Sequence, residues 1–319
     1  MTHPARPDPT DHLPAASPIA GIWPALLTPL DARLQIDHAA FAAHALQLLA
    51  AGCSGLTPFG TTGEGPSFSV AERLTAIDAL IHAGVPAGRI LVSTSCAALP
   101  DAVQLTRHAV QAGARGVLLL PPFFLKGVPD AGIVDFYTQL IEQVADARLR
   151  IMLYNIPQVS GIALSHAVIG SLLQRYPQTL IGLKDSGCQR DTSLAYAQAF
   201  MPPLQVWVGN EPDLQTLAGL GSLGAVSGVA NLAPRLVARL VQGGAGPGAA
   251  SDQARMLALL VVLLRGPWGL TAAFKGLMAQ RSGQPGWRRV RAPLVALTDE
   301  QASELVALRL ALGLDTERD

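Results

Sequence analysis

Several residue types are scarce in this chain of 319 residues, and each scarcity argues against a class of protein. Charged residues make up 14% of the chain and the formal net charge is zero, so no basic stripe or tail marks a nucleic-acid partner. The three cysteines, Cys53, Cys96 and Cys188, are odd in number and far apart. This pattern argues against a disulfide framework and favours a reducing cytoplasm.

Signals for metals and membranes are missing as well. The seven histidines form no His-x-x-x-His or Cys/His cluster, so we expect no metal site. No run reaches ~18 consecutive apolar residues, so we expect no membrane span. Residues 1–18 hold many prolines and few apolar side chains, which predicts a disordered leader rather than a signal or transit peptide.

The sequence from Gly21 onward alternates short apolar runs with helical patterns in units of roughly 25 to 35 residues. Eight such pairs within residues 19–243 predict an α/β fold, a (β/α)8 TIM barrel that forms the catalytic domain. A doubly wound sheet is the alternative, but it usually shows Gly-x-Gly-x-x-Gly after its first strand, and that motif is absent. The expected strands are Gly21–Leu27, Gly55–Thr57, Ile90–Ser93, Gly116–Leu119, Arg150–Tyr154, Leu180–Lys184, Gln205–Gly209 and Ala225–Ser227.

Residues 244–319 begin in a glycine-rich linker and predict a C-terminal helical extension. Its helical patterns are Ser251–Arg265, Gly269–Ser282 and Thr298–Leu312. The last opens with a capping box, Thr298-Asp299-Glu300-Gln301, like Ser69-Val70-Ala71-Glu72 at the second barrel helix. We expect these helices to cover apolar surface or to join subunits. Half of the residues are apolar, which also points to surface covered by partner subunits.

Lys184 closes an apolar run that suits a strand buried on both faces. Burial of its stem disfavours the charged ammonium and makes a nucleophilic amine accessible near pH 7. Only three of the 23 basic residues are lysines, Lys126, Lys184 and Lys275, so each is a candidate for chemistry that arginine cannot do, such as imine formation. The alternative is an ion pair between Lys184 and Asp185 or a neighbouring acid.

Two more motifs follow strand ends at the C-terminal rim, where barrel enzymes hold their active sites. The Gly60–Gly65 loop offers backbone amides and the hydroxyls of Thr61 and Thr62, which suits a carboxylate or phosphate as well as it suits a plain glycine turn. Tyr154 either packs or supplies a phenol that moves a proton. Together with Lys184, these parts would bind a 2-oxo acid and form an imine at its carbonyl.

At this point the chain resembles the pyruvate-dependent class I lyases grouped with dihydrodipicolinate synthase and N-acetylneuraminate lyase. The resemblance runs from about Gly21 to Arg291. Four segments carry it: Gly60-Thr61-Thr62-Gly63-Glu64, Tyr154-Asn155-Ile156-Pro157, Gly182-Leu183-Lys184-Asp185-Ser186 and Gly221-Ser222-Leu223-Gly224-Ala225-Val226-Ser227-Gly228. It implies a TIM barrel with C-terminal helices, assembled as a homotetramer (a dimer of dimers), that uses no cofactor or metal.

The resemblance also implies roles for single residues. Lys184 is the Schiff-base lysine and Tyr154 the proton-handling phenol, while Thr61 and Thr62 hold the carboxylate of the 2-oxo acid. Further positions implied in the substrate pocket are Gly209, Val226 and Glu211.

Two departures from the family pattern bear on the substrate. Val159 stands where the synthases carry an arginine for the second substrate's carboxylate, and an apolar side chain makes no such contact. Phe123 and Phe124 stand where tyrosines commonly extend a proton relay, one of them into a neighbouring subunit. Tyr154 then needs another relay partner, either Thr62 or a water.

We therefore expect reversible aldol cleavage of a 2-oxo-3-deoxy sugar acid, or of a related 4-hydroxy-2-oxo acid, to pyruvate and an aldehyde. A dehydratase of the same acids and a 4-hydroxy-tetrahydrodipicolinate synthase are alternatives, the second disfavoured by Val159. Two further alternatives are a non-catalytic 2-oxo acid sensor and a barrel that binds a phosphate or flavin at Gly224–Gly228.

Overall fold

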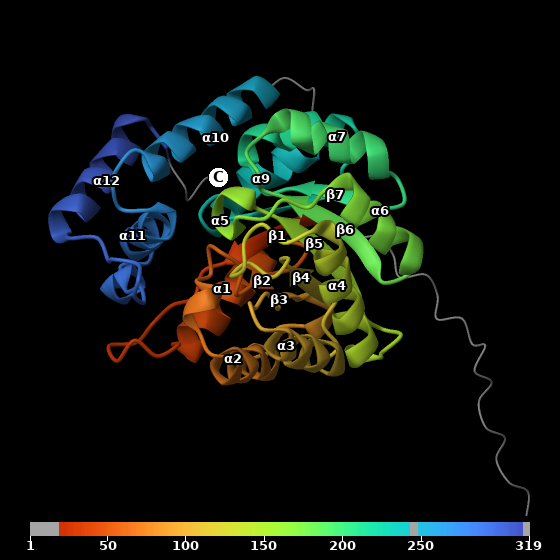
Figure 1. Cartoon of the computed structure of the whole chain (residues 1–319). Coiled ribbons are helices and arrows are strands. Elements are labelled where there is room, and N and C mark those ends of the chain that lie inside the picture. Colours follow the sequence, from red (N-terminus) through yellow and green to blue (C-terminus); the bar gives the residue numbers. More distant parts are fainter. Residues whose placement is uncertain (1–18, 243–247, 315–319) are drawn as a thin grey trace, which may run out of the picture.

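A closed ring of parallel strands forms the centre of the computed structural model, which describes residues 19–242 and 248–314 (Figure 1). The strands pair in the order β2-β1-β8-β7-β6-β5-β4-β3, and a parallel bridge between Leu56 and Ile90 joins the two ends of this series. The strands are β1 (Gly21–Leu26), β2 (Thr57–Pro58), β3 (Leu91–Ser93), β4 (Gly116–Leu119), β5 (Ile151–Asn155), β6 (Leu180–Asp185), β7 (Gln205–Val208) and β8 (Gly224–Ser227). The predicted TIM barrel is confirmed.

Helices follow the strands and surround the ring (Figure 1). The barrel helices are α1 (His38–Ala50), α2 (Val70–His82), α3 (Leu99–Gln111), α4 (Asp130–Val144), α6 (His166–Arg175), α7 (Arg190–Phe200), α8 (Leu214–Gly219) and α9 (Pro234–Val241). The capping box predicted at Ser69 and Glu72 opens α2 with both of its hydrogen bonds. A short helix after β5, α5 (Pro157–Ser160), was not expected from the sequence.

Two hydrophobic cores hold these layers together. The outer core lies between the strands and the helices, and the inner core fills the ring. Trp23 and Trp207 lie in the inner core with their ring centroids 6.3 Å apart. Two glycines make room for them, because a Cβ atom at Gly55 would lie 2.2 Å from the Trp23 ring and one at Gly224 would lie 2.7 Å from the Trp207 ring. The ring is therefore packed with side chains and is not an open pore.

The C-terminal extension forms three helices beside the barrel, α10 (Ala249–Leu264), α11 (Leu270–Ser282) and α12 (Asp299–Ala311) (Figure 1). They lie within a few residues of the predicted patterns, and Thr298 and Gln301 form the expected capping box of α12. The predicted leader, residues 1–18, and most of the predicted linker, residues 243–247, lie outside the described residues. In the two described ranges, no helix has both the length and the apolar character to cross a membrane.

Candidate active site

The register of the barrel strands places Tyr154 and Lys184 side by side. Tyr154 on β5 pairs directly with Lys184 on β6, and both side chains are buried. The Nζ atom of Lys184 lies 4.2 Å from the centroid of the Tyr154 ring. Parallel pairing alone therefore brings an amine and a phenol together near the C-terminal ends of the strands.

Asp185 faces away from the amine of Lys184. Successive side chains of a strand point to opposite faces, so Asp185 points out of the ring. There its carboxylate accepts hydrogen bonds from Asn155 Nδ2 at 2.8 Å and from Ser193 Oγ on α7 at 2.5 Å. Among the described residues, Lys184 forms no ion pair with any acid. The alternative of a structural ion pair between Lys184 and Asp185 is therefore wrong.

Gly209 leaves the space that the Lys184 side chain occupies. A Cβ atom at Gly209, directly after β7, would lie 1.9 Å from Ser186 Oγ and 2.5 Å from Lys184 Cε. The Ser186 hydroxyl is buried and has no hydrogen-bond partner within the described part of the chain. Because a buried hydroxyl normally finds a partner, Ser186 is a polar group available to a ligand held at the lysine.

The Tyr154 hydroxyl contacts the threonine loop through Thr61. Tyr154 Oη and Thr61 Oγ1 lie 3.2 Å apart, which is within hydrogen-bonding distance. Thr62 instead turns toward the end of β8, where its Oγ1 lies 3.3 Å from the Cβ position of Gly228. The relay partner of Tyr154 was expected to be Thr62 or a water. In the structure the hydroxyl in contact is that of Thr61, because the side chain of its neighbour points elsewhere.

Close packing fixes the Gly60–Gly65 loop that carries the two threonines. A Cβ atom at Gly63 would lie 2.5 Å from the Leu26 carbonyl oxygen, and one at Gly65 would lie 1.9 Å from that of Phe59. Glu64 adopts a left-handed backbone conformation with φ of 59°, which is uncommon for a residue with a Cβ atom. The loop is therefore a rigid platform whose shape depends on its glycines.

The remaining predicted positions differ in what they offer a ligand. Glu211 is buried, and its carboxylate accepts hydrogen bonds from Ser227 Oγ at 2.8 Å and from the Val229 amide at 3.3 Å. It therefore holds the segment after β8 in place. Val226 is buried in the same inner core as Tyr154. Val159 is 59% exposed and presents an apolar surface to solvent.

The two phenylalanines after β4 lie in different surroundings. Phe123 packs against the inner core that contains Tyr154. Phe124 is 78% exposed and lines an apolar cavity of about 660 Å³ between the start of α3, the segment after β4 and α4. Neither supplies a hydroxyl to Tyr154, whose own hydroxyl contacts that of Thr61.

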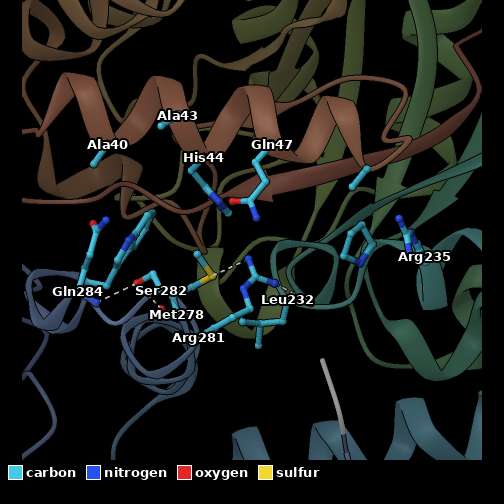
Figure 2. Close-up of a pocket in the computed structure, with 13 residues that line it drawn as sticks. Ala40, Ala43, His44, Gln47, Leu232, Arg235, Met278, Arg281, Ser282 and Gln284 are labelled. Atoms are coloured by element: carbon cyan, nitrogen blue, oxygen red, sulfur yellow. Dashed lines mark hydrogen bonds between the residues drawn. The ribbon is translucent and has the colours of Figure 1, made fainter. Parts of the chain in front are cut away.

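A second cavity, of about 480 Å³, lies outside the strand ring between α1, the segment after β8 and α11 (Figure 2). His44 points into it from α1, and its Nε2 lies 3.0 Å from Asn231 Oδ1. Because the Asn231 amide nitrogen donates to the carbonyls of Ala25 and Gly228, its oxygen is the acceptor and His44 donates from Nε2. Burial lowers the pKa of His44 to about 4, so the imidazole is neutral at pH 7. The described lining holds neither lysine nor tyrosine, unlike the strand ends that carry Lys184 and Tyr154.

Sequence reasoning missed three side chains that lie at or behind the mouth, Ser186, Phe274 and Lys275. Ser186 belongs to the motif around Lys184, but the motif assigns it no role. Phe274 and Lys275 come from α11 and approach the threonine loop across more than 200 residues of sequence. The scarcity of lysine singled out Lys275, and this signal pointed to it without showing where it would lie.

The sequence comparisons identify the family of the chain. The profile of the dihydrodipicolinate synthetase family matches residues 18–311. An uncharacterized DapA-like lyase of Chloroflexus aurantiacus is 33% identical over 299 residues, which cover 91% of this chain and 95% of that protein.

Solved structures share the architecture. The crystal structure of dihydrodipicolinate synthase from Agrobacterium tumefaciens is 34% identical, covers 92% of this chain and 99% of its own, and superposes with a TM-score of 0.86. YagE, a prophage protein of the dihydrodipicolinic acid synthase family from E. coli solved in complex with pyruvate, is 25% identical with a TM-score of 0.82. That similarity covers 93% of this chain and 99% of YagE.

Proposed function

The chain belongs to the dihydrodipicolinate synthetase family of class I lyases, and from this premise we propose that it cleaves a 2-oxo-3-deoxy sugar acid, or a related 4-hydroxy-2-oxo acid, to pyruvate and an aldehyde. The observation that carries the proposal is the buried amine of Lys184, which has no acidic partner among the described residues and lies 4.2 Å from the Tyr154 ring. The pyruvate bound to YagE supports a 2-oxo acid as the ligand.

The reaction begins with an imine on Lys184. The amine adds to the C2 carbonyl of the 2-oxo acid, and loss of water leaves a protonated imine that withdraws electrons from the neighbouring carbons. The hydroxyls and amides of the Thr61–Thr62 loop bind the C1 carboxylate and fix the face of attack. The missing Cβ atom at Gly209 leaves room for the Lys184 side chain that carries the adduct.

Cleavage then breaks the bond between C3 and C4. Tyr154 takes the proton of the C4 hydroxyl, the C3–C4 electron pair moves to form an enamine with the imine nitrogen, and the aldehyde leaves. As Tyr154 takes that proton, it passes its own hydroxyl proton to Thr61 Oγ1, 3.2 Å away, and Thr61, which is exposed to solvent, releases its hydroxyl proton to water. Protonation of the enamine at C3 and hydrolysis of the imine release pyruvate and restore the lysine.

The apolar side chain at Val159 favours a hydroxylated aldehyde over a partner with a second carboxylate. An exposed valine offers no charge or hydrogen bond to a carboxylate, so synthesis of 4-hydroxy-tetrahydrodipicolinate has no anchor there. The buried hydroxyl of Ser186 beside Lys184 instead suits a substrate hydroxyl. We therefore place the sugar-acid substrates ahead of the synthase reaction.

A panel of 2-oxo-3-deoxy acids tests this function, with pyruvate release followed by its enzymatic reduction and the organic products by mass spectrometry. We expect pyruvate and an aldehyde from at least one acid, and no release by Lys184→Arg, which keeps the charge but cannot form the imine. Loss of water without pyruvate release would identify a dehydratase. A borohydride-trapped pyruvate adduct on Lys184 without turnover would identify a sensor, and failure to form any adduct would refute the proposal.

We also propose that the protein assembles as a homotetramer. The supporting observation is the exposed apolar surface after β4, where Phe124 and Leu125 are 78% and 68% exposed and border the apolar cavity of about 660 Å³. Exposed apolar patches of this kind mark contact surfaces between proteins. Light scattering on the eluted protein should give four times the chain mass, and Phe124→Ser should reduce it. A monomeric wild type would contradict the proposed tetramer but would not bear on the proposed cleavage reaction.

A further inference from the structure

The C-terminal extension reaches the threonine loop through one fully buried ion pair. Lys275 on α11 donates to Glu64 of the loop, and both side chains have 0% of their surface exposed. The second oxygen of Glu64 accepts a hydrogen bond from the Arg291 amide at 3.1 Å. Lys275 also donates to the Arg289 carbonyl oxygen at 2.7 Å. Both carboxylate oxygens of Glu64 are thus committed to the C-terminal part of the chain.

Burial makes this pair unlike the other ion pairs among residues 19–242 and 248–314. Removing two charges from water is costly, and the cost is offset only where the geometry is good and further hydrogen bonds satisfy the remaining donors and acceptors. Here those partners are backbone groups of the segment after α11. By contrast, the pair between Arg288 and Asp299 lies at the surface and has no link to the loop. A buried, fully hydrogen-bonded pair such as Glu64 and Lys275 specifies one arrangement of the elements that it joins.

A second contact reaches the same loop from the residue next to Lys275. Phe274 lies against Gly228 at the end of β8, where a Cβ atom would be 3.0 Å from the aromatic ring. The same position is 3.3 Å from Thr62 Oγ1. One turn of α11 therefore supports the threonine loop through Glu64 and bounds the place where its Thr62 side chain lies.

The backbone of the loop makes these contacts consequential. Glu64, two positions after Thr62, is held in the left-handed region at φ 59°. Glycine occupies this conformation at low cost, whereas a residue with a Cβ atom does not. Such conformations persist where surrounding contacts enforce them. The enforcing contacts here are those to Lys275 and Arg291.

We propose that Glu64 and Lys275 are positioning residues that set the Thr61–Thr62 loop for the carboxylate of the 2-oxo acid, so that the C-terminal extension takes part in substrate recognition. This inference rests on the proposed function. It predicts that loss of the pair weakens recognition of the carboxylate more than it weakens the reactivity of Lys184, because the amine is positioned by the register of β5 and β6.

Borohydride trapping separates those two effects. Lys275→Met and the milder, isosteric Glu64→Gln are titrated with pyruvate and with acetaldehyde, a carbonyl compound without a carboxylate. We expect the half-saturating pyruvate concentration to rise on the order of tenfold or more, since small displacements of positioning groups are costly. Trapping by acetaldehyde should stay within about twofold of wild type. Arg288→Ala, which breaks the surface pair, serves as the matched control and should change neither value.

A purely structural pair would lower the unfolding temperature while leaving the pyruvate-to-acetaldehyde ratio as in the wild type, and this result would overturn the inference. If Lys275→Met does not fold, Glu64→Gln decides the question at a temperature where circular dichroism shows it folded. Calorimetry of pyruvate binding in the Lys184→Arg background, with and without Glu64→Gln, decides it without any imine. Equal affinity for pyruvate, or no binding to either protein, refutes the positioning role. If borohydride traps no pyruvate adduct on the wild type, the proposed function alone is refuted.

Discussion

Gly209 is the single residue whose replacement should be felt most directly at Lys184. An added Cβ atom would lie 2.5 Å from Lys184 Cε and 1.9 Å from Ser186 Oγ, so Gly209→Ala should push the amine out of place. We expect the rate of borohydride trapping with pyruvate to fall by about 100-fold. Gly219→Ala, at the end of α8 with open space around it, is the control and should trap at the wild-type rate. Equal rates for both variants would contradict this account of Gly209.

Tyr154 should be needed for cleavage and dispensable for the imine. Tyr154→Phe keeps the ring beside Lys184 and removes the hydroxyl that contacts Thr61. We expect the trapped pyruvate adduct to form and aldol cleavage to slow by about 10²- to 10⁴-fold, the range for loss of a general acid–base group. Thr61→Val should also slow cleavage, by a smaller factor than Tyr154→Phe. Wild-type cleavage by Tyr154→Phe would remove the phenol from the mechanism.

At the scale of the elements, an ion pair joins the start of α2 to the C-terminal segment, and its contribution to stability should decrease in acid. Glu72 closes the capping box and binds Arg291, whose hydrogen bond lowers the pKa of Glu72 from its usual 4.5 to about 2. A lowered carboxyl pKa stabilises the fold above pH 4.5, and this contribution disappears as the pH falls toward 2. The Glu72 side chain is 29% exposed, so the effect should be about 1 kcal/mol or less.

Glu72→Gln isolates this charge, since glutamine also serves in a capping box. Urea unfolding should show the wild type more stable than the variant at pH 7, with the difference shrinking as the pH approaches 3. A difference that does not change with pH would show that the ion pair with Arg291 contributes nothing.

Local patterns predicted the elements well and their contacts poorly. The strand Leu180–Lys184 and the capping boxes at Ser69 and Thr298 were readable because each depends on a few neighbouring residues. The second strand was misplaced by about two residues, since β2 is only Thr57–Pro58 and too short for a periodic signal. The helix α5 occupies a four-residue stretch that opens with Pro157 and gives no helical period.

The candidate site divides in the same way. Lys184, Tyr154 and the threonine loop were found because each lies at or just after the C-terminal end of a barrel strand, and these ends all meet on one rim. The pairing of Glu64 with Lys275 spans 211 residues and depends on how the C-terminal helices dock, which no local pattern contains. For the same reason the extension was expected to cover surface or to join subunits, and its contact with the loop was not foreseen.

At the scale of the whole molecule, Asn231 joins the first barrel unit to the last. Its side chain accepts from the Leu27 amide at 3.1 Å and from His44 Nε2 on α1 at 3.0 Å, and it donates to the Ala25 carbonyl at 2.9 Å. These contacts bridge more than 180 residues of sequence where the ring closes between β1 and β8. The neutral, buried His44 is therefore part of the closure of the barrel.

This burial predicts a loss of stability in mild acid. The pKa of His44 is about 4 in the folded protein against 6.5 for a free histidine, so the unfolded chain binds the proton more readily. The stabilising contribution is complete above pH 6.5 and is lost as the pH falls to 4, by about 3 kcal/mol in all. His44→Gln keeps a donor toward Asn231 but does not titrate. Wild type should lose this amount relative to the variant between pH 7 and 4 in chemical denaturation, and parallel pH profiles would contradict it.

The paired indoles inside the ring give the molecule a built-in optical reporter. Trp207 is the strand neighbour of Lys184 on β7, and Trp23 lies 6.3 Å from it, centroid to centroid. The other two indoles, Trp268 and Trp287, lie in the C-terminal extension or beside it, and phenylalanine in their place would leave emission from the ring alone. Covalent capture of a keto acid changes the charge next to Trp207, so the event can be followed as a change in fluorescence in real time, without a label.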